Sequence, residues 1–429
     1  MRIVVIGAGG IGGWLGARLA STGQPVGFLV HGGTLEALRS EGLTLLDGSG
    51  GEPGTVTARI DEPLVSQDPG TLVDALGGHP DLVFVTTKVD ALPGLAPALR
   101  RLIGPGTGVV STQNGISAPG MLAGAVGTEH VLPGVARVYS AVVSPGNVRT
   151  IGSAGSLALG EWDGRASALA AGAVGVLEAA GIRAWVPDSI WAELWRKVSF
   201  VAVQGALGAA ANVPIGVLRS ELRDVFTAAV GEVVEVAAAM GHDLATDDAS
   251  DPVAAVLALA DAQPAGATTS MQRDIAAGLP SELDAQVGSV CRAGDDTGVA
   301  TPVLDLAHAV LAPREARARG RRGSRTGQAY RRVRRRRPLG ADFSHAPADR
   351  KRDCSVNATL SQRHCRRRPP GGGAPHGPRM VPWRRRPVRK RQPPRTTSST
   401  FTSTPTTPCW TVPERLRTTW PRPSAWASP

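Results

Sequence analysis

The chain has 429 residues and a formal net charge of +11, and this charge is divided unevenly along it. Residues 1–320 hold 20 basic and 32 acidic residues, whereas residues 321–429 hold 27 basic and 4 acidic ones, so an acidic body with room for two domains precedes a basic tail. Because the body contains one cysteine, Cys291, and no apolar run of membrane-spanning length, its composition argues against a disulfide framework or a membrane protein and favours the cytoplasm.

The first predicted elements are a strand and a helix joined by a glycine-rich turn. Residues 2–6 form a short β-branched run, and an apolar helical pattern begins at Trp14. The turn between them reads G-x-G-x-x-G and consists of Gly7, Ala8, Gly9, Gly10, Ile11 and Gly12. In this context the first glycine permits the tight turn, the second lets backbone approach a pyrophosphate, and the third lets helix and strand pack closely. The chain start therefore predicts a dinucleotide site at a helix N-terminus, and it leaves no room for a signal peptide.

Strands and helices then alternate as far as residue 115, a pattern typical of a Rossmann-type doubly wound α/β sheet. The expected strands are Pro25–Val30, Leu43–Leu46, Thr55–Ile60, Asp81–Thr87 and Gly108–Thr112, and the expected helices are Leu35–Ser40, capped by Thr34, and Leu92–Ile103. Ligands in such sheets bind beyond the carboxyl ends of the strands. Four residues follow strand ends, and we expect them to face one crevice: Gly7, His31, Lys88 and Asn114.

The pattern stays mixed up to residue 186 and is helical from Ile190 onwards. The mixed part predicts strands at Val138–Val143, Ser156–Leu159 and Arg183–Val186 and a helix at Leu169–Ala179. The second part predicts helices at Ile190–Ala211, Glu221–Met240, Pro252–Ala262, Ser270–Ala277, Glu282–Arg292 and Thr301–Ala312. We therefore expect a dinucleotide-binding domain over residues 1–187 and an all-α domain over residues 188–318.

Residues 319–429 differ from the rest of the chain in having runs of arginine, proline and threonine without periodicity. Such a segment cannot bury a core, and we expect it to be disordered. A tail of this charge could bind nucleic acid through phosphate contacts. Because no aromatic residues are interleaved at stacking spacing and the onset is abrupt, we favour out-of-frame translation of GC-rich DNA and expect no nucleic-acid partner. The cysteines of the tail lack metal-ligand spacing, and no metal site is expected.

Four polar residues of the body are candidates for chemistry, although each has a structural explanation when taken alone. Lys197 lies on a mostly apolar helix, where a lysine either extends to the surface or is placed in a site. Ser270 opens a helix and could be its N-cap, and Glu282 could favour the N-terminus of the next helix. Asn114, in Gln-Asn-Gly, is a common turn residue.

Six motifs taken together give these residues a common context. They are GAGGIGG at the start, TTK at 86–88, QNG at 113–115, LWRK at 194–197, PIG at 214–216 and TSMQRDIAAGLPSELD at 269–284. On these motifs the chain resembles the ketopantoate reductase (2-dehydropantoate 2-reductase) family over about residues 1–315. The most specific of them is the last, with the pattern S-M-x-x-D-x-x-x-G-x-x-x-E-x-D.

The resemblance implies reduction of a 2-keto acid by NADPH, with ketopantoate converted to pantoate in pantothenate biosynthesis. Lys197 would protonate the carbonyl oxygen, and Glu282 would bind the substrate hydroxyl and help to hold Lys197. Ser270 would bind the substrate carboxylate, Asn114 would orient nicotinamide and substrate, and Lys88 would lie beside the cofactor. The roles agree with the chemistry, because an acid at the oxygen lowers the barrier as negative charge develops there. Dimers are common in families of this architecture, so a homodimer is possible.

The chain departs from the family in three ways, one of which is that its tail continues where the family usually stops. His31 stands where the family usually has an arginine for the 2′-phosphate of NADP, and no acidic residue marks NAD binding. We favour NADPH, with Arg39 as a helper, and NAD is not excluded. Three positions at which the family has asparagine near the substrate are Val201, Gly205 and Ala267.

This loss of polar partners should change which keto acid fits. Two further alternatives therefore remain open. One is a β-hydroxyacid-type dehydrogenase that acts on another small acid. The other is a protein that binds NADP without turnover.

Overall fold

The computed structural model describes residues 1–48, 54–247 and 249–320. The predicted disordered tail lies outside the described residues from position 321 onwards. Within the described residues, no helix is long and apolar enough to cross a membrane.

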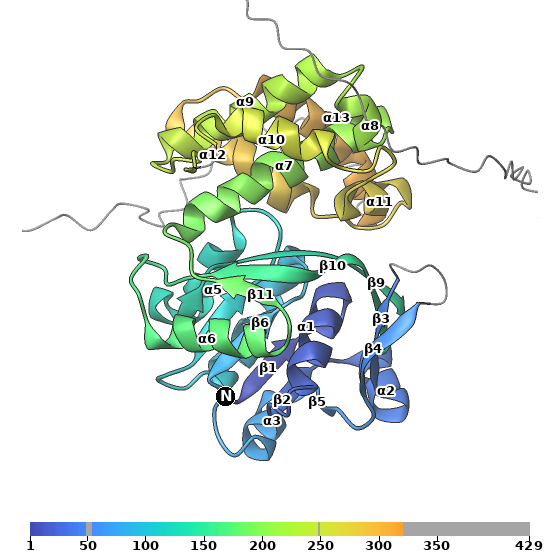
Figure 1. Ribbon diagram of the computed structural model, residues 1–429, viewed down its shortest axis with the longest axis vertical. Coiled ribbons are helices and arrows are strands. Elements are labelled where there is room, and N and C mark those ends of the chain that lie inside the picture. Colours follow the sequence, from blue (N-terminus) through green and yellow to red (C-terminus); the bar gives the residue numbers. More distant parts are fainter. Residues whose placement is uncertain (49–53, 248, 321–429) are drawn as a thin grey trace, which may run out of the picture. The chain divides into compact units, whose positions relative to one another are not determined.

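The first sheet has six parallel strands in the order β5-β2-β1-β6-β7-β8 (Figure 1). Their bounds are β1 Ile3–Ile6, β2 Val26–Leu29, β5 Leu64–Ser66, β6 Leu82–Val85, β7 Gly108–Ser111 and β8 Val131–Leu132. The chain proceeds from β1 to one side and then crosses to β6 on the other, so the point of reversal lies between β1 and β6. This confirms the predicted doubly wound sheet, in which ligands bind at that point.

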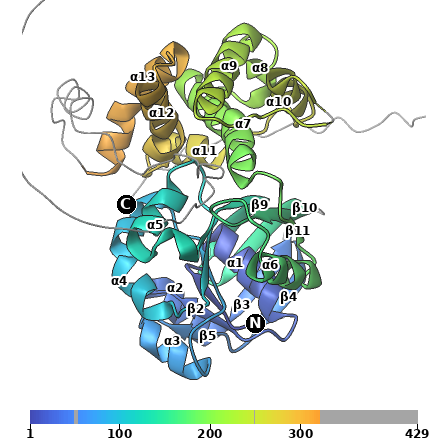
Figure 2. The same cartoon turned by 90° about the vertical axis from the view of Figure 1, so that its left-hand side faces the viewer.

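Both faces of this sheet are buried because successive strand residues point to opposite sides. Ile3 and Val5 belong to the apolar core with α1 (Gly10–Ala20) and α6 (Ala168–Ala179). Val4 and Ile6 belong to a second core with the helices of the other side, which are α3 Pro69–Ala75, α4 Leu92–Leu102 and α5 Ala118–Val126. Figure 2 shows α3 and α4 on one side of the sheet and α6 on the other. Continuous apolar strands are therefore what this position requires.

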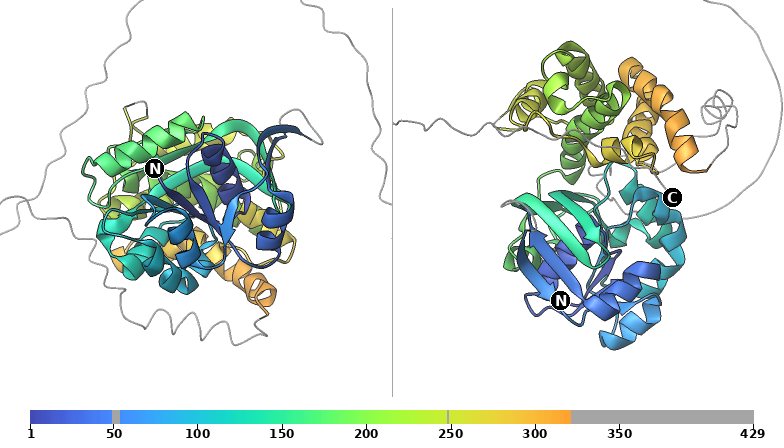
Figure 3. Two further views of the ribbon diagram at one scale, coloured as in Figure 1. Left: turned by 90° about the horizontal axis from the view of Figure 1, so that it is seen from below. Right: turned by 90° about the vertical axis from the view of Figure 1, so that its right-hand side faces the viewer.

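A second, mixed sheet packs against the far side of α1. It contains β3 Leu43–Asp47, β4 Thr55–Ile60, β9 Gly134–Ser144, β10 Asn147–Leu159 and β11 Arg183–Trp185. The hairpin of β9 and β10 extends well beyond the short strands that the sequence predicts in this region (Figure 3, right, in green). Trp14 of α1 is fully buried, and a Cβ on Gly13 would lie 2.4 Å from Cγ2 of Val148 in β10.

The region from Ile190 to Ala318 is helical, as predicted. Its elements are α7 Ile190–Ala211, α8 Ile215–Leu218, α9 Arg223–Ala239, α10 Pro252–Asp261, α11 Ser270–Ala276, the π-helix η3 Asp284–Gly288, α12 Ser289–Thr297 and α13 Pro302–Ala318. The long helix α7 contacts α8, α9, α10, α11 and α13, and one apolar core joins these helices.

Two local predictions are wrong. The helix expected to begin after a Thr34 cap is α2, Gly32–Glu41, which begins three residues earlier with His31 as its N-cap. The helix expected over Glu282–Arg292 is instead the π-helix η3 followed by α12. Hydrophobic periodicity identifies the helical stretch in both cases but does not define its first residue or distinguish a π-helix from an α-helix.

Candidate active site

The glycine turn after β1 is closed by two glycines that no other residue can replace without displacement of backbone. Gly7 has a φ of +90°, which L side chains rarely adopt. A Cβ on Gly12 would lie 2.1 Å from the carbonyl oxygen of Gly7 and 2.4 Å from Oγ1 of Thr86. The Thr86 hydroxyl, at the end of β6, donates to the carbonyls of Ile6 at 2.8 Å and Gly7 at 3.1 Å. The turn is therefore held against the neighbouring strand at the reversal point of the sheet.

The same turn leaves the N-terminus of α1 open to a ligand. Gly9, the N-cap, is exposed, and a Cβ placed on it would meet no atom within 4 Å. The first turn of α1 has no side-chain cap and no acidic residue. Beside it, the Oγ1 of Thr87 is buried and has no hydrogen-bond partner in the described part of the chain. Free helix N–H groups without a competing carboxylate fit the pyrophosphate of a dinucleotide.

The remaining residues of the turn lie around the open N-terminus of α1 and do not block it. Ala8 is buried, whereas Gly10 and Ile11 are half-buried. A Cβ on Gly10 would lie 3.0 Å from Oγ of Ser140 in β9. The second sheet therefore approaches the glycine turn from the side opposite β6.

His31 follows β2 at the same edge of the sheet, since Leu29 is in register with Ile6 of β1. Its side chain is exposed and makes no capping hydrogen bond. Arg39 lies in the last turn of α2, eight residues along and thus roughly 12 Å away along the helix axis. The helix does not bring Arg39 back to the strand end, so the expectation that it assists His31 finds no support in this geometry.

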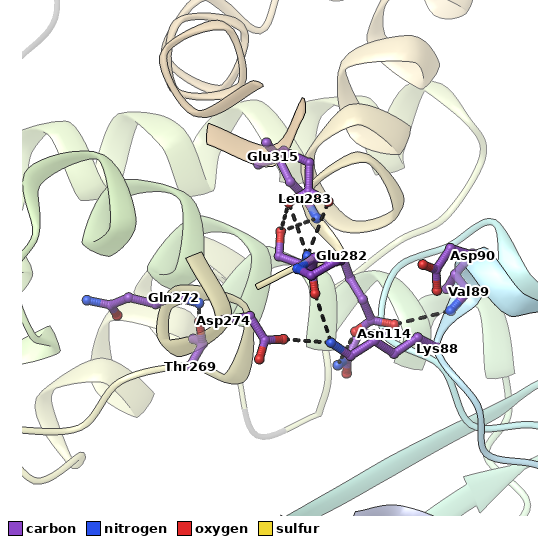
Figure 4. A network of polar contacts seen from close by, with 12 residues as sticks. Lys88, Val89, Asp90, Asn114, Thr269, Gln272, Asp274, Glu282, Leu283 and Glu315 are labelled. Atoms are coloured by element: carbon purple, nitrogen blue, oxygen red, sulfur yellow. Dashed lines mark hydrogen bonds and ion pairs between the residues drawn. The ribbon is translucent and has the colours of Figure 1, made fainter. Parts of the chain in front are cut away.

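Lys88, after β6, contacts the helical region. Its Nζ donates to Oδ2 of Asp274 at 2.9 Å and to the carbonyl of Pro280 at 3.0 Å (Figure 4). The lysine side chain is 50% exposed, so this ion pair is partly in solvent. Asp274 was not among the candidate site residues, although it is the aspartate of the S-M-x-x-D motif.

Asn114, after β7, contacts Glu282. Its Nδ2 donates to Oε2 of Glu282 at 3.2 Å, and the backbone N–H of Val89 donates to Oε1 at 3.4 Å. Gln286 adds a third contact to the same carboxylate, also at 3.4 Å. Next to Asn114, Gly115 has a φ of +92°, and a Cβ there would lie 2.3 Å from the carbonyl oxygen of Ala285. The loop after β7 therefore approaches the segment around Glu282 closely through both side chain and backbone.

Lys197 is half-buried, and its amine is directed to the second sheet. It lies on α7, and its Nζ donates to the carbonyl of Ala136 in β9 at 2.6 Å. Burial of the amine, and secondarily the charge of Arg137, lower the pKa of Lys197 from 10.5 to about 8, while the charge of Glu282 acts in the opposite direction. An amine with such a pKa exchanges protons readily near neutral pH. Arg137, which sequence reasoning missed, carries no motif signal.

Ser270 is the first residue of α11, but it is not the N-cap. Thr269 has that position, and its Oγ1 accepts from the N–H of Gln272 at 3.1 Å. The Ser270 side chain is exposed and makes no hydrogen bond within the described residues. Its hydroxyl is thus available to a ligand at the start of a helix.

Two of the three positions at which the family has asparagine pack against apolar side chains, and the third has no room for a larger residue. Val201 and Ala267 are partly buried against the core of the helical region. A Cβ on Gly205 would lie 2.6 Å from Cε of Met271 and 2.9 Å from Oγ1 of Thr269, so the space of a larger residue is taken. Since Lys197, Val201 and Gly205 are four residues apart on α7, they follow one face of that helix.

The long motif at residues 269–284 is explained by these contacts. Asp274 pairs with Lys88, and Gly278 ends α11 with a φ of +68°. Glu282 binds Asn114 and Val89, and Asp284 pairs with Arg292 at 2.8 Å. No cluster of three or more histidine, cysteine or acidic side chains within the described ranges could hold a metal ion.

Comparison with known proteins places this arrangement in a family. Residues 3–164 match the model of ketopantoate reductase PanE/ApbA, and residues 189–315 match that of its C-terminal part. A 2-dehydropantoate 2-reductase of Halobacterium salinarum is 31% identical over 307 residues, which span 71% of this chain and 95% of the relative. The crystal structure of 2-dehydropantoate 2-reductase from Methylococcus capsulatus is 28% identical, covers 74% of this chain and 98% of that chain, and has a TM-score of 0.65.

A likeness of fold alone extends further. The ternary structure of a D-mandelate dehydrogenase with NADH and anilino(oxo)acetate has a TM-score of 0.64 at 23% identity and covers 74% of this chain and 99% of that one. The two family models together span most of the described residues, and the strand-end and helical motifs occur within them. The chain therefore belongs to the ketopantoate reductase family of oxidoreductases.

Proposed function

We propose that this protein reduces a 2-keto acid with NADPH, and that ketopantoate, reduced to pantoate in pantothenate biosynthesis in the cytoplasm, is the first substrate to test. The observation that carries the proposal is the enclosed amine of Lys197, whose pKa of about 8 suits a general acid. Support for the substrate comes from the relatives named 2-dehydropantoate 2-reductase. The proposal assigns cofactor binding to residues 1–187 and most of substrate binding to residues 188–318.

The glycine turn fits a nicotinamide dinucleotide because Gly9 and the first turn of α1 present open N–H groups. When bound, NADPH would supply the hydride that adds to the carbonyl carbon. We favour NADPH over NADH because His31 follows β2 and no acidic residue stands there to bind a ribose 2′-hydroxyl.

Each polar side chain of the site has a separate role in the reduction of the carbonyl group. Protonated Lys197 donates a proton to the carbonyl oxygen, which becomes the hydroxyl of the product, and the amine is left neutral. Its enclosed position favours that neutral form, and water restores the proton afterwards. The Glu282 carboxylate orients the Asn114 amide and favours the charged form of Lys197. The exposed Ser270 hydroxyl binds the substrate carboxylate.

A second candidate substrate follows from Val201, Gly205 and Ala267. The face of α7 next to Lys197 is apolar at Val201, and Met271 fills the space beside Gly205. A 2-keto acid with an apolar substituent would leave no polar group unpaired there, whereas the hydroxyl of ketopantoate would depend on Glu282 alone.

Steady-state reduction by the purified full chain tests these proposals. NADPH and NADH are compared as cofactors with ketopantoate and 3-methyl-2-oxobutanoate as substrates. We expect turnover with NADPH that declines as pH rises through about 8, because Lys197 then loses its proton. Turnover of neither keto acid with either cofactor would refute the enzymatic proposal. Preferential oxidation of a 3-hydroxy acid would favour the β-hydroxyacid-type dehydrogenase instead.

A further inference from the structure

The segment of residues 280–282 is held by a different contact at each position. The carbonyl of Pro280 accepts from Lys88, and the carboxylate of Glu282 accepts from Val89 and Asn114. Between them, Ser281 is 1% exposed. The orientation of Glu282 toward the loops after β6 and β7 therefore depends on how the backbone at Ser281 is fixed.

Glu315 of α13 fixes that backbone. Its two carboxylate oxygens accept from the N–H of Ser281 at 3.1 and 3.2 Å, and Oε2 also accepts from the Ser281 hydroxyl at 2.6 Å. The same hydroxyl oxygen accepts from the N–H of Leu283 at 3.2 Å. Figure 4 shows Glu315 next to Leu283 and Glu282. The N–H and the hydroxyl of Ser281 are thus both engaged within this cluster, directly before Glu282.

Arg319, the C-cap of α13, joins this cluster to the α/β region. Its Nε donates to Glu315, its Nη2 donates to the carbonyl of Ser281 at 2.7 Å, and its Nη1 donates to Oδ2 of Asp90 at 2.8 Å. Asp90 directly follows Val89, whose N–H binds Glu282. The Arg319 side chain is 26% exposed and that of Asp90 is 44% exposed. The charge-assisted bonds to Glu315 and Ser281 are therefore partly buried, whereas the bond to Asp90 is partly in solvent.

We propose that Arg319 is a positioning residue for the reduction: by tying Ser281 to Asp90, it holds the Glu282 carboxylate against Val89 and Asn114. The inference rests on the proposed function, since Glu282 matters here through the keto acid site. Arg319 itself touches neither substrate nor cofactor. A planar guanidinium can reach three acceptors at once in this way, which a lysine ammonium on a flexible stem does less well.

The position of Glu282 has a measurable consequence at Lys197. Two charges act on this amine, Arg137 of β9 lowering its pKa and Glu282 raising it, in addition to the effect of burial. If Glu282 moves away, the raising contribution shrinks and the pKa of Lys197 falls. The alkaline limb of the rate profile then moves to lower pH, a change that a uniformly less stable protein would not show.

Arg319→Ala in the full chain tests the proposal, with Arg317→Ala as the matched control. Arg317 is exposed in the last turn of α13, and its side chain makes no hydrogen bond or ion pair within the described residues. We expect a loss of kcat/KM of roughly tenfold to a hundredfold for Arg319→Ala, because small misplacements of a site carry such losses. We also expect an alkaline limb at lower pH and an NADPH dissociation constant, measured by fluorescence titration, that changes by less than about twofold. Arg319→Lys should lie between wild type and alanine.

Amide hydrogen exchange gives a readout that does not depend on turnover. Faster exchange at Ser281 and Leu283 in Arg319→Ala, with no change in Arg317→Ala, supports the tie. If Arg319→Ala does not fold, Asp90→Ala removes the acceptor on the other side of the tie and should shift the same alkaline limb. The proposal would be overturned if Arg319→Ala had the same alkaline limb of the pH–rate profile and the same kcat/KM as Arg317→Ala. Absence of any wild-type turnover would instead refute the proposed function and leave the exchange data to decide on the tie.

Discussion

The α/β region and the helical region position their share of the site by different means. In the α/β region, Gly7, His31, Lys88 and Asn114 follow the ends of four neighbouring parallel strands that are in register. Their placement is a property of the backbone. In the helical region, Lys197 lies on α7, Ser270 begins α11 and Glu282 precedes η3. Helix packing places these elements next to one another, and side-chain hydrogen bonds to the α/β region hold Lys197 and Glu282.

This difference predicts which substitutions each region tolerates. Where backbone alone positions a residue, an added Cβ is harmful even though no side chain is lost. Where side chains position a residue, loss of a polar or charged group is harmful even though the backbone is unchanged. Each prediction below tests one side of this contrast.

The largest effect is expected for Gly12→Val in the α/β region. Its Cβ would lie 2.1 Å from a backbone oxygen of Gly7, which cannot give way without opening the turn between β1 and α1. We expect a loss of more than about 3 kcal/mol in the free energy of unfolding, measured by urea denaturation. Gly9→Ala is the matched control, because its Cβ meets nothing within 4 Å. That variant should unfold like wild type yet bind NADPH more weakly. Equal stability of wild type and Gly12→Val would contradict the view that backbone packing at Gly12 holds the turn between β1 and α1.

Lys197→Met tests the helical region and is expected to cost activity. Loss of the proton donor should reduce kcat by roughly a thousandfold, as is common for general acids. Methionine keeps most of the volume of the side chain, so the fold should persist and NADPH should still bind. Near-normal turnover in this variant would exclude Lys197 as the acid, and tight cofactor binding without catalysis in either form would favour a non-catalytic protein.

The lowered pKa of Lys197 also makes the free energy of unfolding depend on pH, and Lys197→Met should remove this dependence. The pKa of Lys197 is about 8 in the folded chain and 10.5 unperturbed, so the unfolded chain binds more protons between these values and stability rises with pH there. Below pH 8 the Lys197 amine is charged in both the folded and the unfolded chain. The free-energy cost of burying this charge is then fully present and is at most about 3 kcal/mol. The free energy of unfolding of wild type minus that of Lys197→Met, measured by denaturation near neutral pH and at about pH 10, should show this rise. A difference independent of pH would contradict an enclosed amine.

The contrast also explains how far the sequence could predict the molecule. The glycine turn, the strand ends and the helical character of the second region depend on neighbours in the chain, and patterns reveal them. The Lys88–Asp274 pair joins residues 186 positions apart, and only the fold shows it. The same holds for the π-helix Asp284–Gly288, which periodicity presents as an ordinary helix, and for the pKa of Lys197, which depends on a strand of another region.

Gly115→Ala lies between the two regions and should have an intermediate effect. The substitution strains a φ of +92° and places a Cβ 2.3 Å from the carbonyl oxygen of Ala285. We expect a loss of about 2–3 kcal/mol in the free energy of unfolding and a lower kcat, because Asn114 moves away from Glu282. Gly127→Ala has a similar φ of +93° but meets only the flexible side chain of Glu129. An equal loss in both variants would show that backbone strain alone, and not the close approach, matters.

The smallest effect is expected for the ion pair of Lys88 and Asp274. It crosses between the two regions, but the lysine side chain is 50% exposed, and exposed pairs contribute little. A double-mutant cycle of Lys88→Met and Asp274→Asn should therefore give a coupling free energy below about 1 kcal/mol by urea denaturation. A coupling well above 2 kcal/mol would mean that a side chain, and not only the strand end, positions this part of the α/β region. The contrast between backbone-held and side-chain-held site residues would then fail at Lys88, the one of the four strand-end residues that forms a salt bridge in the described structure.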